Sequence, residues 1–362
     1  MNTSALVNVL THAGDRSRVE RAQQAGDWIV YGAGRTGRKW VTALAESGRK
    51  VHAFLDRAAI PEAALPVYPL AECPDALRRR CSVLLALHNP GADVAQVRRQ
   101  LLAAGFQEVW LLQDLIDAWP QLSHFWLAPA SETLPHQTDI VAAHDALADE
   151  HSQTLMTALL DQRLNGNADA LSRPETETHY LPLGLPRPPS PMRYIDCGAY
   201  TGDTIQSFLN HGITFEAIAA FEPEPNNYPR LCKTIAPFRA AACHCGVWDS
   251  MTQLCFSSDE DASHVDSTGE IMVQVVALDQ ALPNFAPTLI KMDIEGAENR
   301  ALLGARKTIE THRPYLAIST YHKPRDLWEL LLLIKSWNLD YRFYLRTHCH
   351  NGFETVLYGH PG

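Results

Sequence analysis

The stretch Arg193-Tyr194-Ile195-Asp196-Cys197-Gly198-Ala199-Tyr200-Thr201-Gly202 decides the fold of this chain. Its apolar first half is typical of a buried strand, and its glycines allow a tight turn. The residues that follow have the spacing of an amphipathic helix, with Ile205, Phe208 and Leu209 on one face. A strand, a glycine-rich turn and a helix in this order predict the opening unit of a doubly wound α/β sheet.

Further strand patterns follow this unit along the chain. Apolar runs predict strands at 217–221, 240–247, 288–293 and 315–320, and a hairpin of 254–256 with 272–276. A polar loop containing Asn351-Gly352 separates two last runs, 341–345 and 353–358, and predicts a final antiparallel hairpin. Seven strands with a reversed last pair favour the sheet of a methyltransferase over that of a dehydrogenase.

A second unit with the same order of elements comes earlier in the chain. A strand at 28–31 turns at Gly32 into a helix, and a second strand ends at Asp56. Strands at 82–87 and 108–112 flank a helix that ends near Gly105. We therefore expect two doubly wound Rossmann-like α/β domains. Residues 1–120 form a nucleotide-binding-type domain, 121–191 a helical bridge with a proline-rich linker, and 192–362 the domain with the antiparallel final hairpin.

Length, charge and cysteine content exclude several classes of protein. A chain of 362 residues is long enough for two domains. Its net charge of -10 disfavours binding to nucleic acid, because a phosphate backbone attracts clustered Lys and Arg. No apolar run reaches the roughly 20 residues of a membrane span, and eight cysteines are too sparse for a disulfide scaffold. We expect a cytoplasmic protein with reduced thiols, and a homo-oligomer is compatible with these features.

The first glycine-rich loop, Gly32-Ala33-Gly34-Arg35-Thr36-Gly37-Arg38, has the spacing of a dinucleotide fingerprint. Its charged side chains are basic, which suits a phosphate at a helix N-terminus. It resembles the nucleotide-binding domains of some sugar-modifying enzymes, also through Leu65-Pro66-Val67-Tyr68. NAD or a nucleotide-sugar is the expected ligand, unless the glycines only form a tight turn beside an empty crevice. The candidate residues of this second nucleotide site are Gly32, Gly34, Arg35, Gly37 and Asp56.

The second glycine-rich loop has the opposite charge, because Asp196 and Asp203 lie in it. A pyrophosphate there would be repelled, whereas a cationic ligand would be attracted. S-adenosylmethionine offers an ammonium and a sulfonium for the acids and a ribose diol for Glu222, which ends the next strand and can accept both hydroxyls. The pattern therefore favours S-adenosylmethionine, with another mononucleotide as the alternative.

Three motifs in residues 190–360 resemble the FkbM family of methyltransferases, which use S-adenosylmethionine on a Rossmann-like class I fold. The motifs are Ile195 to Thr204, Phe221-Glu222-Pro223-Glu224-Pro225-Asn226, and Ile290-Lys291-Met292-Asp293-Ile294-Glu295-Gly296-Ala297-Glu298. The resemblance implies that Asp196, Gly198, Gly202 and Thr204 line the methionine end of the cofactor, Glu222 the ribose, and Gly246-Val247-Trp248-Asp249 the adenine edge, with Asp293 at the reactive centre. The same loops add Ala199, Tyr200, Asp203 and Pro223 to the expected cofactor-binding residues.

Methyl transfer to a hydroxyl needs a group that takes the acceptor proton. His322 is our candidate base, because it follows a strand at the carboxyl edge of the sheet, although a structural loop histidine is an equal alternative. Asp293 and Glu295 flank the same edge, where they can orient the acceptor, take its proton or hold a divalent cation. The sequence assigns no metal. His348, His350 and Glu354 either shape the acceptor site or lie in a solvated loop.

The sequence thus predicts an S-adenosylmethionine-dependent methyltransferase that acts on a hydroxyl of a small molecule or glycan. Two alternatives stay open. One is a nucleotide-sugar or NAD-dependent enzyme centred on the N-terminal domain, although that domain has no plausible Tyr-x-x-x-Lys pair for hydride transfer. The other is a protein that binds the cofactor without turnover.

Overall fold

The computed structural model describes residues 3–13, 17–57, 64–171, 174, 178–259, 262–265 and 271–362, with backbone only for residue 18 and for the described residues between 256 and 271. The chain clusters into two compact units. The first contains residues 1–141, 154–174 and 349–353, and the second contains residues 142–153, 175–348 and 354–362.

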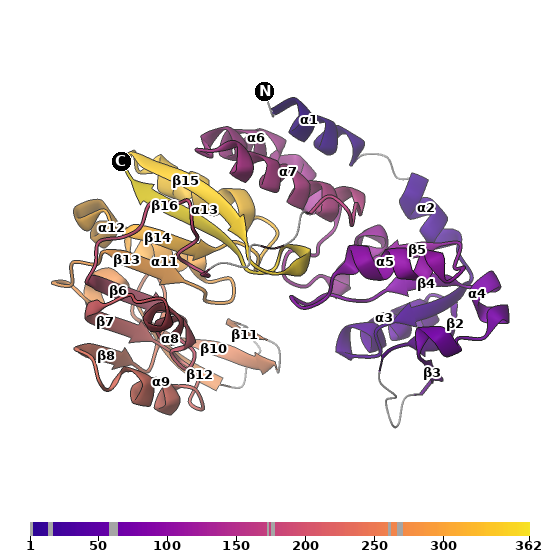
Figure 1. Ribbon diagram of the computed structural model, residues 1–362, viewed down its shortest axis with the longest axis horizontal. Helices are drawn as coiled ribbons and strands as arrows, with labels where there is room; N and C mark the ends of the chain where they lie inside the picture. Colours follow the sequence, from indigo (N-terminus) through magenta and orange to yellow (C-terminus); the bar gives the residue numbers. More distant parts are fainter. Residues whose placement is uncertain are drawn as a thin grey trace. The chain divides into compact units, whose positions relative to one another are not determined.

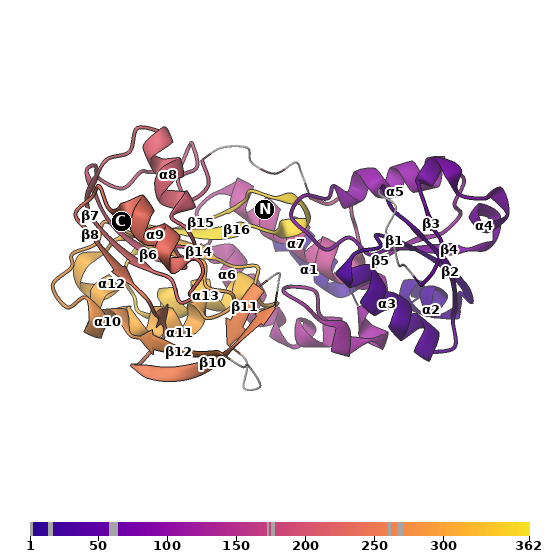
Figure 2. The ribbon, with the colours of Figure 1, turned by 90° about the horizontal axis from the view of Figure 1, so that it is seen from below.

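The N-terminal unit contains a five-stranded sheet in the order β3-β2-β1-β4-β5. Every strand pair in it is parallel, which confirms the predicted doubly wound α/β arrangement. Helices α3 and α5 lie on opposite faces of this sheet (Figure 2). The elements are α1 (Thr3–His12), α2 (Ser17–Gln24), β1 (Asp27–Tyr31), α3 (Arg35–Glu46), β2 (Lys50–Leu55), β3 (Val67–Tyr68), α4 (Asp75–Arg80), β4 (Ser82–Leu85), α5 (Val94–Ala103) and β5 (Val109–Leu111).

The second unit contains a seven-stranded sheet in the order β15-β16-β14-β13-β6-β7-β8 (Figure 1). From β8 to β14 all neighbours are parallel, whereas β16 runs antiparallel to both β14 and β15. The predicted final hairpin is confirmed. The predicted reversal of both its strands is wrong, because only β16 runs opposite to the other strands of this sheet. The strands are β6 (Met192–Cys197), β7 (Phe215–Phe221), β8 (Ala240–Cys243), β13 (Leu289–Met292), β14 (Tyr315–Ser319), β15 (Tyr341–Thr347) and β16 (Thr355–Pro361).

The strand predicted at 240–247 is wrong as one element, because the chain leaves the large sheet after Cys243. The carbonyl of Cys243 accepts the last bond of that sheet, from the N–H of Glu222 (3.1 Å), and Trp248 then donates to Val276 (2.8 Å). This change of partner forms a second sheet in the order β11-β10-β12-β9. Its strands are β9 (Gly246–Val247), β10 (Thr252–Asp259), β11 (Ala262–Val265) and β12 (Ile271–Val276).

Helices cover both faces of the seven-stranded sheet. Figure 2 shows α8 and α9 on one face and α10 to α13 on the other, with the change of side between β6 and β13. Ligands of doubly wound folds bind at this switch point, outside the carboxyl ends of the strands. The remaining helices are α6 (Gln137–Ala146), α7 (Glu150–Asn165), α8 (Asp203–Asn210), α9 (Tyr228–Ile235), α10 (Leu278–Ala281), α11 (Glu298–Gly304), α12 (Arg306–His312) and α13 (Asp326–Ser336).

Gly198 packs closely against the end of β13. Its φ of +79° lies in the left-handed region, and a Cβ at this position would be 1.9 Å from the carbonyl oxygen of Asp293. Only glycine satisfies both conditions, because the conformation disfavours other residues and the space is already occupied by backbone.

Replacing Gly198 by Ala should therefore destabilise the second unit more than replacing Gly212, whose φ is +75° but whose Cβ would meet nothing within 4 Å. The left-handed conformation costs about 1 to 2 kcal/mol in either variant. Overpacking adds about 1 to 3 kcal/mol in Gly198→Ala. Chemical unfolding of both variants measures the difference, and equal losses of stability would contradict the close approach.

Candidate active site

The carboxyl ends of β6, β7, β13 and β14 meet at one edge of the sheet, because these strands are parallel neighbours. The residues that end or follow them therefore lie close together, as the sequence predicts. They include Asp196, Glu222, Asp293 and His322.

A buried ion pair lies beneath this edge. Asp196 and Lys291 are direct partners in the β6–β13 register, and Lys291 Nζ lies 3.1 Å from Asp196 Oδ1. The same ammonium donates to the carbonyl of Gly198 (2.6 Å). Burial alone would lower the pKa of Lys291, but the carboxylates of Asp196 and Asp293 outweigh it and raise that pKa. Asp196 is fully buried, so its charge is offset by Lys291 rather than presented to a ligand.

The glycine-rich loop after β6 has three residues in the left-handed region, Gly198, Tyr200 and Gly202. A Cβ on Gly202 would be 2.6 Å from Thr234 Cγ2, so α9 packs closely against the turn. Tyr200 is exposed, whereas Ala199 and Thr204 are buried. Asp203 begins α8 and is exposed, which leaves it as the acid of this loop that faces solvent.

Glu222 connects the loop after β7 to the loop after β6. Its Oε2 accepts the N–H of Tyr200 (2.8 Å), and its Oε1 accepts the N–H of Glu224 (2.9 Å). The side chain is buried, which raises the pKa of Glu222, while the two N–H groups oppose that shift. The Asn227 side chain is a third hydrogen-bonding neighbour of this carboxylate, which leaves one lone pair for a further donor. Pro223 is half-buried beside it.

The segment Gly246-Val247-Trp248-Asp249 lies against α11 and is held by aromatic and ionic contacts. Arg300 lies over the ring of Trp248 (5.3 Å) and pairs with Asp249 (2.5 Å). A Cβ on Gly304 would be 2.0 Å from the carbonyl oxygen of Trp248, so helix and segment approach at backbone distance. These contacts fix the half-buried Trp248 at this edge.

Three carboxylates lie within 3.5 Å of one imidazole, and Glu354 is a fourth acid that interacts with it electrostatically. We call Asp293, Glu295, Glu298, Glu354 and His322 the acidic cluster. His322 Nδ1 lies 2.9 Å from Glu298, and Nε2 lies 3.3 Å from Asp293 and 3.5 Å from Glu295. Burial would lower the pKa of His322, but these carboxylates, Glu298 above all, raise it to about 10. His322 is therefore an imidazolium at neutral pH, and it can act as a base only after losing that proton.

Asp293 is held ionised by its neighbours. Its Oδ2 accepts the hydroxyl of Tyr180 (2.8 Å), and its Oδ1 lies 3.4 Å from the hydroxyl of Tyr321. Burial acts to raise the pKa of Asp293, but Lys291 and His322 outweigh it and hold that pKa at about 2. Asp293 is thus a fixed negative charge at the edge of the sheet.

Glu295 and Glu354 differ from Asp293 in their protonation. Burial, opposed by His322 and reinforced by Asp293, raises the pKa of Glu295 to about 7. Burial and then Asp293 raise the pKa of Glu354 to about 7 as well. Both residues have positive φ, +55° and +52°. The cluster thus contains two carboxyl groups that change charge near neutral pH.

Sequence reasoning missed three aromatic members of this region, His179, Tyr180 and Tyr321. Tyr321 lies beside His322 in the same strand-end segment, so the segment itself was a signal. His179 and Tyr180 lie in a stretch without periodic pattern and offered none. His348, which the sequence left between two roles, interacts with the hydroxyl of Tyr358 (2.8 Å) and lies beside His179. His350 belongs to the N-terminal unit.

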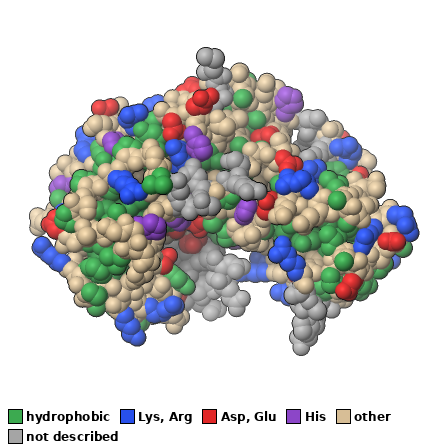
Figure 3. Space-filling view, in the orientation of Figure 1, with side chains coloured by type: hydrophobic (Ala, Val, Ile, Leu, Met, Phe, Trp, Pro, Cys, Tyr) green, Lys and Arg blue, Asp and Glu red, His purple; other side chains and the backbone are tan. Residues whose placement is uncertain are grey.

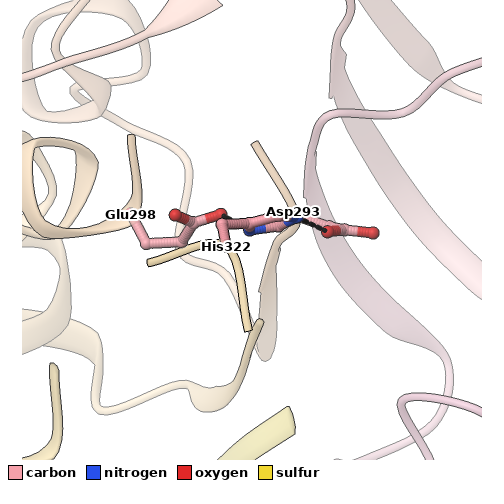
Figure 4. A group of neighbouring side chains, drawn as sticks. All are labelled: Asp293, Glu298 and His322. Carbon is pink, nitrogen blue, oxygen red and sulfur yellow. Dashed lines mark hydrogen bonds and ion pairs between the residues drawn. The ribbon is translucent and has the colours of Figure 1, made fainter. Parts of the chain in front are cut away.

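Asp293, Glu298 and His322 offer ligand atoms within 4.8 Å of one another, a donor set that divalent cations accept. Figure 4 shows the imidazole between the two carboxylates, with one ring nitrogen toward each. These contacts form a chain of ion pairs from Glu298 through His322 to Asp293.

The residues of the predicted second nucleotide site also come together, within the N-terminal unit. Asp56 Oδ2 accepts the N–H of Ala33 (2.8 Å), which ties the end of β2 to the loop after β1. Gly34 and Arg35 begin α3 directly after this loop. A Cβ on Gly37 would be 1.8 Å from the carbonyl oxygen of Gly32, so α3 packs tightly on the turn.

The fold of the second unit is that of Rossmann-like methyltransferases, and comparison with known proteins agrees with it. The methyltransferase FkbM domain matches residues 196–343. These residues are an FkbM methyltransferase domain, and the chain is accordingly a methyltransferase. The family implies S-adenosylmethionine as cofactor. No curated protein matches the chain.

The fold is shared with a solved structure, methyltransferase FkbM from Methylobacillus flagellatus KT, at a TM-score of 0.80 and 22% identity over 99% of each chain. The CMeT domain of a citrinin polyketide synthase is also similar, at a TM-score of 0.29 and 12% identity over 99% of this chain and 97% of that one, too low to support an argument. Among the described residues, no helix combines the length and apolar character needed to cross a membrane.

The raised pKa of His322 should depend on Glu298, its closest partner. A histidine whose folded pKa is about 10, against 6.5 for the free side chain, stabilises the fold fully below pH 6.5, and that stabilisation is lost as pH rises through 10. Imidazole NMR should show His322 protonated at pH 8 and the pKa lowered by at least about one unit in Glu298→Gln. Glu310→Gln, which alters an exposed pair with Arg306, should leave it unchanged. Titration of His322 near pH 6.5 would contradict the assignment.

Proposed function

We propose that the second unit binds S-adenosylmethionine at the loops after β6, β7 and β8 and transfers its methyl group to a hydroxyl of a small molecule or glycan. The observation that carries the proposal is the position of Glu222. Its buried carboxylate ends β7 beside the glycine-rich loop, where one ribose hydroxyl can use the remaining lone pair and a second can replace the Asn227 side chain.

The charges of the edge support a cationic nucleoside rather than a dinucleotide. Asp203, Glu222 and Asp293 are acids there, and the nearby Lys291 is already paired with Asp196. A pyrophosphate would therefore be repelled by Asp203 and Glu222, which have no cationic partner in the ion pairs described, whereas an ammonium and a sulfonium would be stabilised. The amino-acid end would lie at the loop containing Gly198 and Gly202, and the adenine beside Trp248.

S-adenosylmethionine supplies an electrophilic methyl group when bound. The protein has to hold the acceptor hydroxyl in line with that group, and positioning of this kind can supply much of the acceleration. Asp293, the imidazolium of His322 and the hydroxyl of Tyr321 form a fixed polar edge that can orient a hydroxyl by hydrogen bonds. Figure 3 shows Lys and Arg scattered among Asp and Glu on the face drawn, which supports a small or glycan acceptor over nucleic acid.

Glu222→Ala and His322→Ala should have different effects. Two hydrogen bonds to a charged group contribute about 1.5 to 3 kcal/mol each, so Glu222→Ala should weaken S-adenosylmethionine binding at least about 100-fold. His322→Ala should leave that affinity within about threefold and lower kcat about 100-fold or more, because it removes a fixed charge near the acceptor.

Calorimetry measures the binding, and transfer of a labelled methyl group to a panel of glycerol, sorbitol and free oligosaccharides measures turnover. Glu216→Ala is the matched control, because Glu216 lies at the exposed start of the same strand and pairs with Arg193. Equal losses of binding in the Glu222 and His322 variants would refute the two roles.

A nucleotide or nucleotide-sugar ligand for the N-terminal unit is a second candidate function. Gly32, Gly34 and Gly37 each meet one structural requirement of a dinucleotide-binding loop. Gly32 makes the turn at φ +99°, Gly37 allows close packing of α3, and a Cβ on Gly34 would meet nothing within 4 Å. The space over Gly34 is where a phosphate would approach the N-terminus of α3.

Gly34→Val should fill that space without disturbing the fold, because Gly34 has a φ of -70°. We expect it to abolish calorimetric binding of NAD or UDP-glucose, whichever the wild-type chain binds. Gly26→Val is the control, since a Cβ there also meets nothing within 4 Å. If the wild-type chain binds neither NAD nor UDP-glucose, this second function is refuted.

A further inference from the structure

We propose that Glu354 is the catalytic residue that takes the proton from the acceptor hydroxyl. The inference rests on the proposed methyl transfer to a hydroxyl. It assigns the proton-accepting step to a residue that the sequence left between shaping the acceptor site and lying in a solvated loop. Glu354 follows the turn between β15 and β16, and its side chain lies beside Tyr321 at the carboxyl edge of the sheet.

The other carboxylates of the acidic cluster are committed to the imidazolium of His322. Glu298 is fully buried, contacts Nδ1 and accepts the N–H of Ile294 (2.9 Å). Asp293 and Glu295 lie within 3.5 Å of Nε2. Glu295 has a pKa of about 7, like Glu354, but a proton taken up by any carboxylate in contact with the imidazolium would give up an ion pair.

The contacts of Glu354 are instead with neutral groups. Its Oε1 accepts the hydroxyl of Tyr321 (3.2 Å), and its Oε2 lies 3.4 Å from His179 Nε2. His179 stacks on Tyr180 (3.8 Å) beside His348, and burial, with a contribution from His348, lowers the pKa of His179 to about 3. Protonation of Glu354 therefore breaks no ion pair with these two neighbours. Its side chain is 25% exposed, so the proton can pass on to water.

The groups that face Glu354 from the neighbouring elements set its affinity for a proton. Burial and the charge of Asp293 raise its pKa, whereas His322, the Tyr321 hydroxyl and Lys291 lower it. The balance of about 7 is close to the value at which a general base is most effective at neutral pH.

Tyr321 links Glu354 to Asp293. Its hydroxyl lies 3.2 Å from Glu354 Oε1 and 3.4 Å from Asp293 Oδ1, and its single proton can be donated to one of them at a time. An ionised Glu354 competes for that donor, and a protonated Glu354 releases it to Asp293. Tyr321 and His179 are therefore positioning residues for Glu354.

The proposed step balances in atoms and electrons. The acceptor oxygen uses a lone pair to bond the methyl carbon, and the electron pair of the carbon–sulfur bond stays with sulfur. The O–H electron pair remains on the acceptor oxygen, and the proton goes to the Glu354 carboxylate. Glu354 later loses that proton to water, so one proton is released per methyl group transferred.

Carboxyl NMR of the full chain labelled with ¹³C-glutamate measures the pKa of Glu354 and its dependence on Tyr321, and it needs no acceptor. One resonance, identified by its absence in Glu354→Gln, should titrate near pH 7, and Tyr321→Phe should move it upward because a hydrogen bond to the charged form is lost. A Glu354 resonance that titrates near the ordinary value of about 4.3 would overturn the proposal.

Methyl transfer to the fastest acceptor of the panel tests the role itself. Glu354→Gln should lower kcat about 10²- to 10⁴-fold and remove the acidic limb of the kcat–pH profile, with S-adenosylmethionine affinity unchanged by calorimetry. Glu295→Gln is the matched variant and should retain that limb. A limb that persists in Glu354→Gln and disappears in Glu295→Gln would overturn the assignment. Failure of the wild-type chain to bind S-adenosylmethionine would refute the proposed function instead, and the NMR titration would still report on Glu354.

Discussion

The buried ion pair between Asp196 and Lys291 is the interaction on which the rest of the site depends. It joins the neighbouring strands β6 and β13 at register partners, and the same ammonium holds the carbonyl of Gly198. Removing one partner of such a pair costs about 3 to 5 kcal/mol, because the other charge is left buried and unpaired. The pair therefore fixes the glycine-rich loop against the end of β13, the same end from which Asp293 projects.

Because Asp196 is paired with Lys291, its role differs from that of the other acids at this edge, which the sequence does not distinguish from it. Asp196 is a structural charge, whereas Asp203 and Glu222 lie at the loops proposed for the cofactor. Beyond β13 the acidic cluster combines one imidazolium with carboxyl groups of different affinity for protons. Asp293 is held ionised and Glu354 changes charge near neutral pH, so neighbouring carboxylates can have different chemical roles.

Much of the fold could be predicted from the sequence, because apolar runs and glycine-rich turns are local signals. The opening strand and helix of both units and the final hairpin were predicted and are confirmed. The break after Cys243 was missed, since a run of similar residues does not reveal a change of hydrogen-bond partner. The pairing of Asp196 with Lys291 depends on strand order, and the contacts of His179 and Tyr180 join segments far apart in the chain. Sequence spacing alone could place His322 at the edge, but its charge follows from three carboxylates contributed by the neighbouring loop and helix.

The central claim is that the edge beside Glu222 accepts a sulfonium nucleoside. A crystal structure of the chain soaked with S-adenosylmethionine tests it most directly. The account predicts the ribose diol within hydrogen-bonding distance of the Glu222 carboxylate and the sulfonium on the side of Asp293. Density for the nucleoside elsewhere, or an edge beside Glu222 that stays empty at saturating ligand, would contradict it.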